Sequence, residues 1–379
     1  MLKTKTQISA FCSRPFKRLK FTPEGDVTMC CFQERKCLGN ILKNNLEEIW
    51  FSPLAEDIRK ETLANNLHTI CKVDSCPFSK NKVQQPEDFI AKMFPDEFEI
   101  DIPSQHCNIG GETPSVKNPA CMMCERHLRD PKDFYQQDNL EQVCKKLKPY
   151  MRHVKWLHIQ GVAEPFWKDR IFDVLEYLGV KENKEKIWIS TTTNGTLMNE
   201  RHRKLFLEYP MSTITWSMDA GSPEVYKVIR RVDMYNKIVE NLKNYSKEIK
   251  SGQFIHIHNN INVINIEDVD KMVYLAAEVG INRLDFNATY GIPAICVNKE
   301  NVHIFKEAQK RIMALSKKLG VYTTFMRNLT LDFMDPPTEQ EVEEEIKKLD
   351  FNEAFIKNGC PDNRPLDIGP TEQLVQITI

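Results

Sequence analysis

The sequence predicts an α/β protein that forms a partial (β/α)6 TIM-type barrel, preceded by a small cysteine-rich domain. From residue 98 onward, strand-like segments alternate with helical patterns of about ten residues or more. Such alternation implies a parallel sheet, and six β/α units fit an open or partial barrel better than a full eightfold one. Before residue 96 the pattern is short and irregular, and six of the 12 cysteines fall within 12–76.

The individual elements follow from the hydrophobic periodicity of the chain. The expected strands cover 98–103, 154–159, 186–191, 212–217, 254–262 and 282–287. The expected helices cover 137–150, 167–179, 197–208, 222–231, 234–249 and 267–279. A helix over 299–318, a strand over 321–325 and an acidic helix around 338–349 complete the chain. We therefore expect a cysteine-rich domain over 1–95, the barrel over 96–330, and a C-terminal helix and tail over 331–379.

The first 95 residues contain short elements. Residues 18–22 and 26–29 flank Pro23-Glu24-Gly25, which predicts a β-hairpin, and 46–50 and 53–66 have the pattern of short helices. Cysteines are many and continuous apolar segments are few. We therefore expect metal, rather than a large core, to hold this domain together.

Composition limits the classes of function. Lys+Arg 52 against Asp+Glu 53 gives a net charge of -1, so no global field favours nucleic acid or membrane. No apolar run reaches the ~18–20 residues of a membrane span, and the N-terminus has no stretch of signal-peptide type. We therefore expect a cytoplasmic protein. In that reducing compartment the clustered cysteines are expected to bind metal rather than form disulfides.

Three cysteines follow the first expected strand of the barrel. Cys107 is separated by 13 residues from the pair Cys121 and Cys124, which have two residues between them. Three thiolates in one loop fit an iron–sulfur cluster with one iron that lacks a protein ligand. The alternative is a zinc site completed by a histidine such as His106 or His127.

Polar segments also follow the next three expected strands. They are 161–166 with Gly161 and Glu164, 191–196 with Asn194, and 217–230, which ends in Arg230. Glycine lets a backbone approach a ligand, a carboxylate accepts from an ammonium group, and arginine pairs with a carboxylate. Because ligands bind at the carboxyl ends of parallel strands, one ligand with an amine, a carboxylate and hydroxyls is expected there.

By the order of these motifs over about 98–290, the sequence resembles the radical S-adenosylmethionine (SAM) superfamily. The resemblance implies that Cys107, Cys121 and Cys124 hold a [4Fe-4S] cluster whose free iron binds the amino and carboxylate groups of SAM. Reduction of the cluster would cleave SAM to a 5'-deoxyadenosyl radical, which takes a hydrogen atom from the substrate. A reductant such as flavodoxin or ferredoxin is implied as a partner.

The resemblance also implies the residues that bind the cofactor. The segment 161–165 is similar to the family's Gly-Gly-Glu-Pro segment at the SAM amine, Ser217 and Asp219 to its ribose contacts, and Arg230 to its carboxylate partner. Met123 stands where the family places an apolar residue beside adenine. The full implied set is Met123, Gly161, Val162, Ala163, Glu164, Thr193, Asn194, Ser217, Asp219 and Arg230.

Two departures from the family's pattern predict an unusual branch. The family's usual triplet spacing is three residues and then two, whereas here it is 13 and two. Loop-closure entropy grows only slowly with loop length, so the longer loop costs little. Val162-Ala163 replaces the second glycine of the amine-binding segment, which adds side-chain bulk.

The N-terminal region is similar to a SPASM-type auxiliary cluster domain. Cys12, Gly25 and Cys30 match its opening, and Cys71 and Cys76 follow in the expected order. The resemblance implies that Cys12, Cys30, Cys71 and Cys76 hold a second [4Fe-4S] cluster. A structural zinc knuckle is the alternative, and Cys31, Cys37 and Cys360 have no assigned role. In the family this module usually follows the barrel, whereas here it precedes it.

The implied function is that of a radical SAM oxidoreductase. A peptide is the preferred substrate class, with crosslinking, epimerisation or oxidation as the reaction. A sugar or other small molecule is the alternative substrate, and a non-catalytic zinc-binding adaptor is the rival from another class. No catalytic residue is assigned, although Cys296 and Tyr290 are candidate radical donors for an epimerase.

Overall fold

The computed structural model describes residues 12–30, 37–64, 66–71, 94–103, 107, 109, 121–124, 135–161, 163–183, 186–289, 292–326 and 337–349. The chain forms two compact units. The first comprises Met1–Asp101, Tyr135–His158 and Phe172–Ile187, and the second comprises Ile102–Phe134, Ile159–Ile171 and Trp188–Ile379. This division rests on compactness, and the predicted domain boundaries at 95 and 330 stay predictions.

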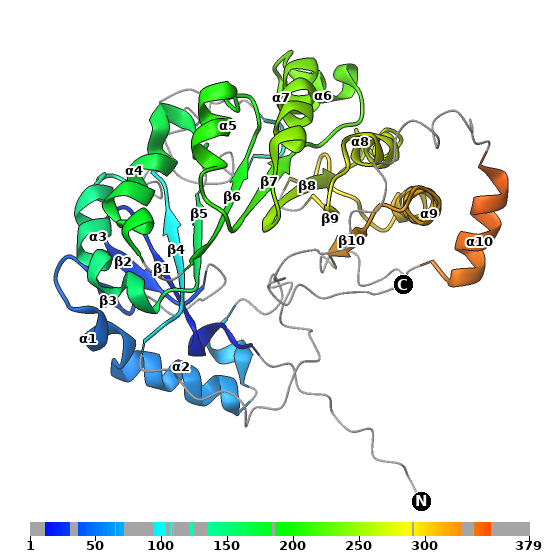
Figure 1. Cartoon of the computed structure of the whole chain (residues 1–379). Coiled ribbons are helices and arrows are strands. Elements are labelled where there is room, and N and C mark those ends of the chain that lie inside the picture. The colour runs from blue at the N-terminus through cyan, green and yellow to red at the C-terminus, as the bar shows by residue number, and fades with distance from the viewer. Residues whose placement is uncertain are drawn as a thin grey trace, which may run out of the picture. The chain divides into compact units, whose positions relative to one another are not determined.

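The second unit contains a parallel sheet. Its strands are β6 (Trp188–Thr193), β7 (Ser212–Ser217), β8 (Gln253–Ile261), β9 (Arg283–Ala288) and β10 (Thr323–Met326), hydrogen-bonded in that order. Every neighbouring pair is parallel, and the register places Ser217 beside His258. The parallel α/β prediction is therefore confirmed. The carboxyl ends of these strands lie along one edge of the sheet (Figure 1).

Helices alternate with these strands and cover one side of the sheet (Figure 1). They are α5 (Glu200–Phe206), α6 (Pro223–Arg230), α7 (Tyr235–Glu248), α8 (Lys271–Val279), α9 (Val302–Leu319) and α10 (Glu339–Lys348). Their ends follow sequence signals: Pro223 opens α6, Gly280 ends α8 in the left-handed conformation, and Thr338 forms a capping box with Glu341. α10 packs through Val342 against Met313 and Ala314 of α9.

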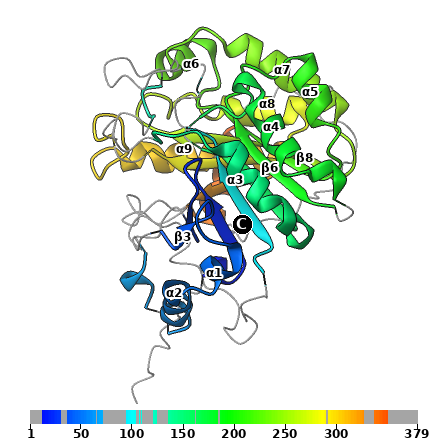
Figure 2. The same ribbon diagram turned by 90° about the vertical axis from the view of Figure 1, so that its left-hand side faces the viewer.

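The first unit contains the hairpin predicted at its start. Strand β1 (Arg18–Phe21) pairs antiparallel with β2 (Asp26–Thr28), which pairs with the short strand β3 (Gly39–Asn40). The helices α1 (Leu46–Trp50) and α2 (Pro53–Leu63) follow, as Figure 2 shows in blue. The remaining α-helices and strands of the described residues are β4 (Glu97–Asp101), α3 (Leu140–Leu147), β5 (Trp156–Gln160) and α4 (Arg170–Tyr177).

The sequence analysis missed one pairing in the first unit. β1 also runs parallel to β4, with Arg18 opposite Glu97 and Phe21 opposite Ile100. The cysteine-rich segment therefore contributes a strand beside the first strand of the predicted barrel. No local pattern signals this pairing, because its two strands are far apart in sequence.

Apolar packing and buried charges both stabilise the first unit. Trp50, Phe21 and Ile58 are almost fully buried, so the expectation that metal would replace a core underestimated the apolar contribution. Arg18 contacts Glu99 at 2.7 Å, and Lys20 contacts Glu99 at 3.2 Å. The pKa of Glu99 is well below its usual value because the charges of Lys20 and Arg18 outweigh the effect of burial.

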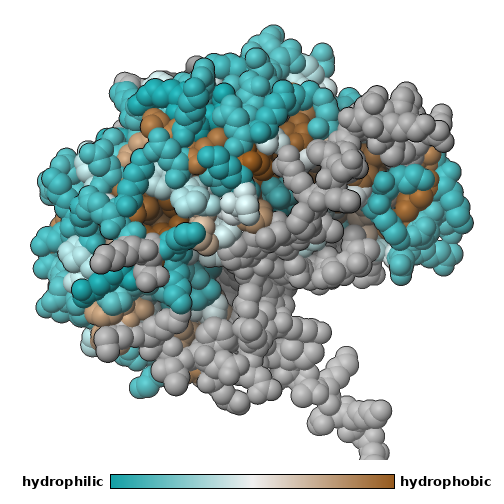
Figure 3. Space-filling model, in the orientation of Figure 1, coloured by the Kyte–Doolittle hydropathy of each residue, from teal (hydrophilic) through white to brown (hydrophobic). Residues whose placement is uncertain are grey.

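On the face shown in Figure 3, the described residues are mainly hydrophilic, with hydrophobic residues visible between them. Large hydrophobic side chains that are exposed include Phe51, Leu63, Val228, Val263 and Ile304. Among the described helices, none combines the length and the hydropathy that a membrane span requires.

Candidate functional site

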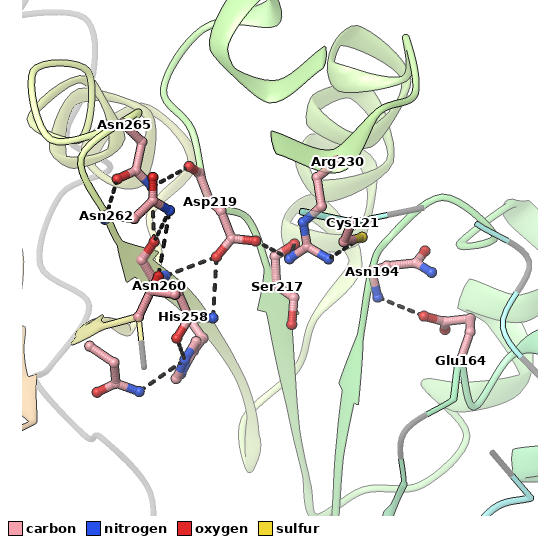
Figure 4. A network of polar contacts seen from close by, with 12 residues as sticks. Cys121, Glu164, Asn194, Ser217, Asp219, Arg230, His258, Asn260, Asn262 and Asn265 are labelled. Carbon is pink, nitrogen blue, oxygen red and sulfur yellow. Dashed lines mark hydrogen bonds and ion pairs between the residues drawn. The ribbon is translucent and has the colours of Figure 1, made fainter. Parts of the chain in front are cut away.

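The predicted site residues of the second unit gather at the carboxyl ends of β6 and β7. Figure 4 shows Arg230 between Asp219 and Cys121, with Glu164 and Asn194 nearby. These residues come from four separate segments: the loop after β5, the turn after β6, the loop after β7 with α6, and 121–124. The sheet therefore brings together groups that are distant in sequence.

Glu164 is fully enclosed at this edge. It is 1% exposed and accepts hydrogen bonds from the Thr193 hydroxyl at 2.7 Å and from the backbone N–H of Asn194 at 2.6 Å. The N–H of Phe166 also donates to it, at 3.3 Å. Burial raises the pKa of Glu164 to about 7, although these donors and Arg230 oppose the rise. A cation bound beside Glu164 would stabilise its ionised form.

Gly161 sits where no side chain fits. Its φ is +148°, and a Cβ atom would lie 2.6 Å from the carbonyl oxygen of Ile102. The backbone N–H of Ile102 donates to the carbonyl of Gln160 at 2.6 Å, which explains the close approach. Glycine at this position therefore lets the segment before Glu164 pass directly against residue 102.

Replacing Gly161 with alanine should destabilise the protein by ~2–4 kcal/mol, because the added methyl group meets backbone and the φ is unfavourable. Thermal or denaturant unfolding measures this loss. Gly320 is the matched control, since its φ is +67° but nothing lies within 4 Å of its Cβ position. Gly320→Ala should cost only the ~1–2 kcal/mol of backbone strain. Equal losses in the two variants would contradict the steric argument.

Arg230 contacts both the loop after β7 and the cysteine segment 121–124. Its guanidinium forms an ion pair with Asp219, donates to the carbonyl of Ser217 at 3.0 Å and to the sulfur of Cys121 at 3.7 Å. Asp219 is 0% exposed. Burial lowers the pKa of Arg230, but the charges of Asp219 and Cys121 outweigh it, so the pKa is raised and Arg230 is a permanent cation.

The cysteine segment is held against α6. The N–H of Met122 donates to the carbonyl of Ile229 at 2.8 Å, and that of Cys124 donates to the carbonyl of Cys121 at 3.1 Å. Cys107, Cys121, Met123 and Cys124 are all half-buried.

The three thiols have the donor chemistry of an iron–sulfur site. Burial raises the pKa of Cys121, the charge of Arg230 lowers it, and the charge of Cys107 raises it further. Within the described residues, no three His, Cys, Asp or Glu side chains form a ready-made group for a single metal ion. Iron is nevertheless compatible with these groups, because metal coordination removes a thiol proton and Arg230 favours the resulting anion.

The N-terminal cysteines lie in the first unit. Cys12, Cys30 and Cys71 are half-buried, and Arg14 donates to the sulfur of Cys30 at 3.2 Å. Cys37 is exposed and its thiol donates to the carbonyl of Gly39 at 2.8 Å. Several residues named in the sequence analysis lie outside the described residues: Cys31, Cys76, His106, His127, Val162, Tyr290 and Cys360.

Three asparagines that the sequence analysis missed brace Asp219 (Figure 4). The backbone N–H of Asn260 donates to the Asp219 carboxylate at 2.8 Å. The side chain of Asn265 donates to the backbone carbonyl of Asp219 at 2.7 Å and to that of Asn260 at 2.9 Å. The N–H of Asn262 donates to the Asn265 side chain at 2.8 Å, and both side chains are fully buried. The spacing Asn-Val-Ile-Asn after β8 was the available signal.

The sequence matches the models of two protein families. The radical SAM superfamily matches over residues 105–276, and SPASM, an iron–sulfur cluster-binding domain, matches over 12–77. The SPASM match therefore precedes the radical SAM match along the chain, as the sequence analysis predicted. A search of curated proteins finds no match.

Several solved structures are similar to this chain. Histidine-tagged anSMEcpe with bound AdoMet has a TM-score of 0.46 and 19% identity, and the match covers 61% of this chain and 64% of that chain. Streptococcus suis SuiB bound to S-adenosylmethionine has a TM-score of 0.45 and 15% identity, with 81% and 66% covered. SuiB bound to its precursor peptide SuiA has a TM-score of 0.45 and 14% identity, with 86% and 76% covered. The match spans less than two thirds of the length of anSMEcpe.

The order of the two family matches agrees with the parallel α/β unit and with the cysteine-rich segment that precedes it. The predicted fold class, a partial barrel with an N-terminal SPASM domain, is thus confirmed. The chain belongs to the radical SAM superfamily and carries a SPASM iron–sulfur domain in its N-terminal region.

Proposed function

We propose that the protein reductively cleaves SAM at a [4Fe-4S] cluster held by Cys107, Cys121 and Cys124. Addition of one electron would break the bond between the SAM sulfur and the 5' carbon and yield methionine and a 5'-deoxyadenosyl radical, which takes a hydrogen atom from a substrate. The observation that carries the proposal is the contact of Arg230 with both Asp219 and Cys121, because it joins the predicted ribose-binding residue, the predicted carboxylate-binding residue and a predicted cluster ligand. The iron–sulfur cluster supplies the electron for this reaction, and the protein supplies binding and electrostatics.

The polar groups of the site match the polar groups of SAM. Glu164 can pair with the amino group, Arg230 with the carboxylate, and Ser217 and Asp219 with the ribose hydroxyls. The backbone at Gly161, Val162 and Ala163 would border the amino group, and Met123 would lie beside adenine. Thr193 and Asn194 act through Glu164, whose carboxylate they hold by hydrogen bonds.

We further propose that Cys12, Cys30, Cys71 and Cys76 hold a second, auxiliary [4Fe-4S] cluster. Arg14 beside the sulfur of Cys30 supports this, because a cation stabilises a thiolate ligand. A peptide is the proposed substrate class, on the basis of the SPASM module, and a sugar or other small molecule is the alternative. Flavodoxin or ferredoxin would supply electrons.

Anaerobic purification tests the proposal directly. The protein should be brown, should contain iron and sulfide in cluster amounts, and should form 5'-deoxyadenosine from SAM when dithionite is added. A colourless zinc protein would instead identify the non-catalytic adaptor. A brown protein that never cleaves SAM would leave only a role in electron transfer.

The asparagines that hold Asp219 lead to a separate prediction. Replacing Asn265 with alanine should weaken SAM binding about tenfold, because Asp219 loses a hydrogen bond that fixes it opposite Arg230. Equilibrium dialysis with labelled SAM measures the affinity. Asn259→Ala is the matched control, since Asn259 is equally buried on β8 and its side-chain amide has no partner among the described residues. Similar losses in both variants would contradict a positioning role for Asn265.

A further inference from the structure

Tyr226 has a buried hydroxyl group with unusual surroundings. The residue is 0% exposed, and its hydroxyl has no hydrogen-bond partner within the described part of the chain. Buried hydroxyl groups normally form hydrogen bonds, so a buried hydroxyl without one needs an explanation, such as a bound group that accepts from it. By comparison, the hydroxyl of Tyr235, whose ring lies 5.8 Å from that of Tyr226, donates to the carbonyl of Gly221 at 2.8 Å.

The position of Tyr226 on α6 directs it toward the cysteine segment. It lies four residues before Arg230, so both side chains occupy the same face of the helix. Arg230 on that face contacts the sulfur of Cys121. The backbone of α6 also contacts the same cysteine segment, because the N–H of Met122 donates to the carbonyl of Ile229. Burial raises the pKa of Tyr226, the charge of Arg230 lowers it, and the charges of Cys121, Asp219 and Glu164 raise it further.

Of the anionic groups near Tyr226, two are already engaged by other donors. Both oxygens of Glu164 accept hydrogen bonds, from Thr193 and from the N–H of Asn194. The two oxygens of Asp219 contact Arg230 and the N–H of Asn260. The sulfur of Cys121 already accepts from Arg230 at 3.7 Å, but metal binding would convert it from a neutral thiol into a thiolate that can accept a further hydrogen bond.

We propose that the Tyr226 hydroxyl donates a hydrogen bond to the cluster-bound sulfur of Cys121 and thereby raises the reduction potential of the cluster. This inference rests on the proposed function. Hydrogen bonds to the sulfurs of an iron–sulfur cluster tune its potential. The reduced cluster carries one more negative charge than the oxidised one, so a donor stabilises the reduced form more. Tyr226 would therefore make it easier for the external reductant to reduce the cluster, while making the reduced cluster a weaker electron donor to SAM.

Redox titration of the reconstituted holoenzyme, followed by electron paramagnetic resonance, tests the inference. The cluster of interest is the one whose spectrum changes when SAM is added. Tyr226→Phe should make reduction threefold to tenfold less favourable, which is a fall of about 30–60 mV for one electron. Its affinity for SAM should stay within twofold of the wild type, because the lost contact is to sulfur.

Tyr245→Phe is the matched control. Tyr245 is also buried on a helix of the second unit, α7, and burial alone raises its pKa, whereas charged groups contribute to the shift of Tyr226. The reduction potential of the cluster in Tyr245→Phe should equal that of the wild type. Phenylalanine fits the space of Tyr226, and the metal-free variant should unfold no earlier than the wild type, which separates a redox effect from misfolding.

A reduction potential of Tyr226→Phe equal to that of the wild type would overturn the inference while leaving the proposed function in place. If SAM binding were also weaker in that variant, the hydroxyl would instead contact the SAM carboxylate. A wild-type protein that binds no iron would overturn the proposed function itself.

Discussion

Replacing Cys121 with alanine should abolish the formation of 5'-deoxyadenosine from SAM. Cys121 is the predicted cluster ligand that Arg230 contacts, so its loss would remove a proposed iron ligand and a partner of the proposed SAM-binding arginine together. Loss of an outer-shell partner of a metal site typically costs ~10–100-fold, and loss of a ligand should exceed that. Chromatography of the products formed in the presence of dithionite measures the effect.

The controls for this variant come from the other cysteines. Cys296→Ala should leave SAM cleavage unchanged, since Cys296 is half-buried and lies outside both cysteine clusters. Cys12→Ala should keep cleavage that is uncoupled from substrate, because Cys12 belongs to the proposed auxiliary site. If Cys12→Ala abolished cleavage as fully as Cys121→Ala, the N-terminal cluster would be required for folding or for reduction.

The affinity for SAM should depend on pH through Glu164. Its pKa is raised to about 7 by burial, and only the ionised carboxylate can pair with the SAM ammonium group. Affinity should therefore fall about tenfold from pH 8 to pH 6, as Glu164 gains its proton. Calorimetric titration at several pH values measures the change. Glu164→Gln should bind SAM weakly throughout, with this pH dependence removed.

The same group should have the opposite effect on the SAM-free protein. The pKa of Glu164 rises from about 4.5 to about 7 on folding, so the folded state holds a proton that the unfolded state has lost. The protonated carboxyl of Glu164 contributes to the free energy of unfolding below pH 4.5. This contribution, up to ~3 kcal/mol, is lost as the pH rises to about 7. Glu164→Gln should remove this slope. If Glu164→Gln and the wild type had the same slope, this carboxyl would not titrate as described.

Sequence reasoning succeeded where the signal was local. The strand at 212–217 was predicted with its observed bounds. Ser217 is its last residue, and Asp219 and Arg230 follow it within one strand–loop–helix unit. Parallel strands bring their carboxyl ends together, so the meeting of Glu164 with Asn194 also followed from the order of segments. The observed ends of some elements differ from the predicted ends by a few residues. The strand predicted at 186–191, for example, is observed at Trp188–Thr193, because residues at the ends of an element have weak structural preferences.

The missed features depend on contacts between distant segments. Asn265 looks like a turn residue in sequence, and only the return of its loop to the end of β7 makes it a partner of Asp219. Tyr226 fits an apolar helix face, so nothing in the pattern distinguishes it from a core tyrosine. The pairing of β1 with β4 requires a register that hydrophobic alternation does not specify between remote strands.

That pairing has a consequence for how the chain folds during synthesis. β1 emerges from the ribosome long before β4, and neither its backbone hydrogen bonds to β4 nor the ion pairs of Arg18 and Lys20 can form until residue 101 is available. Contacts so distant in sequence slow folding, because loop closure precedes any gain. The first unit therefore cannot complete itself as an early, independent module. A fragment that begins after residue 95 would also leave Glu99 and Asp101 without their cations.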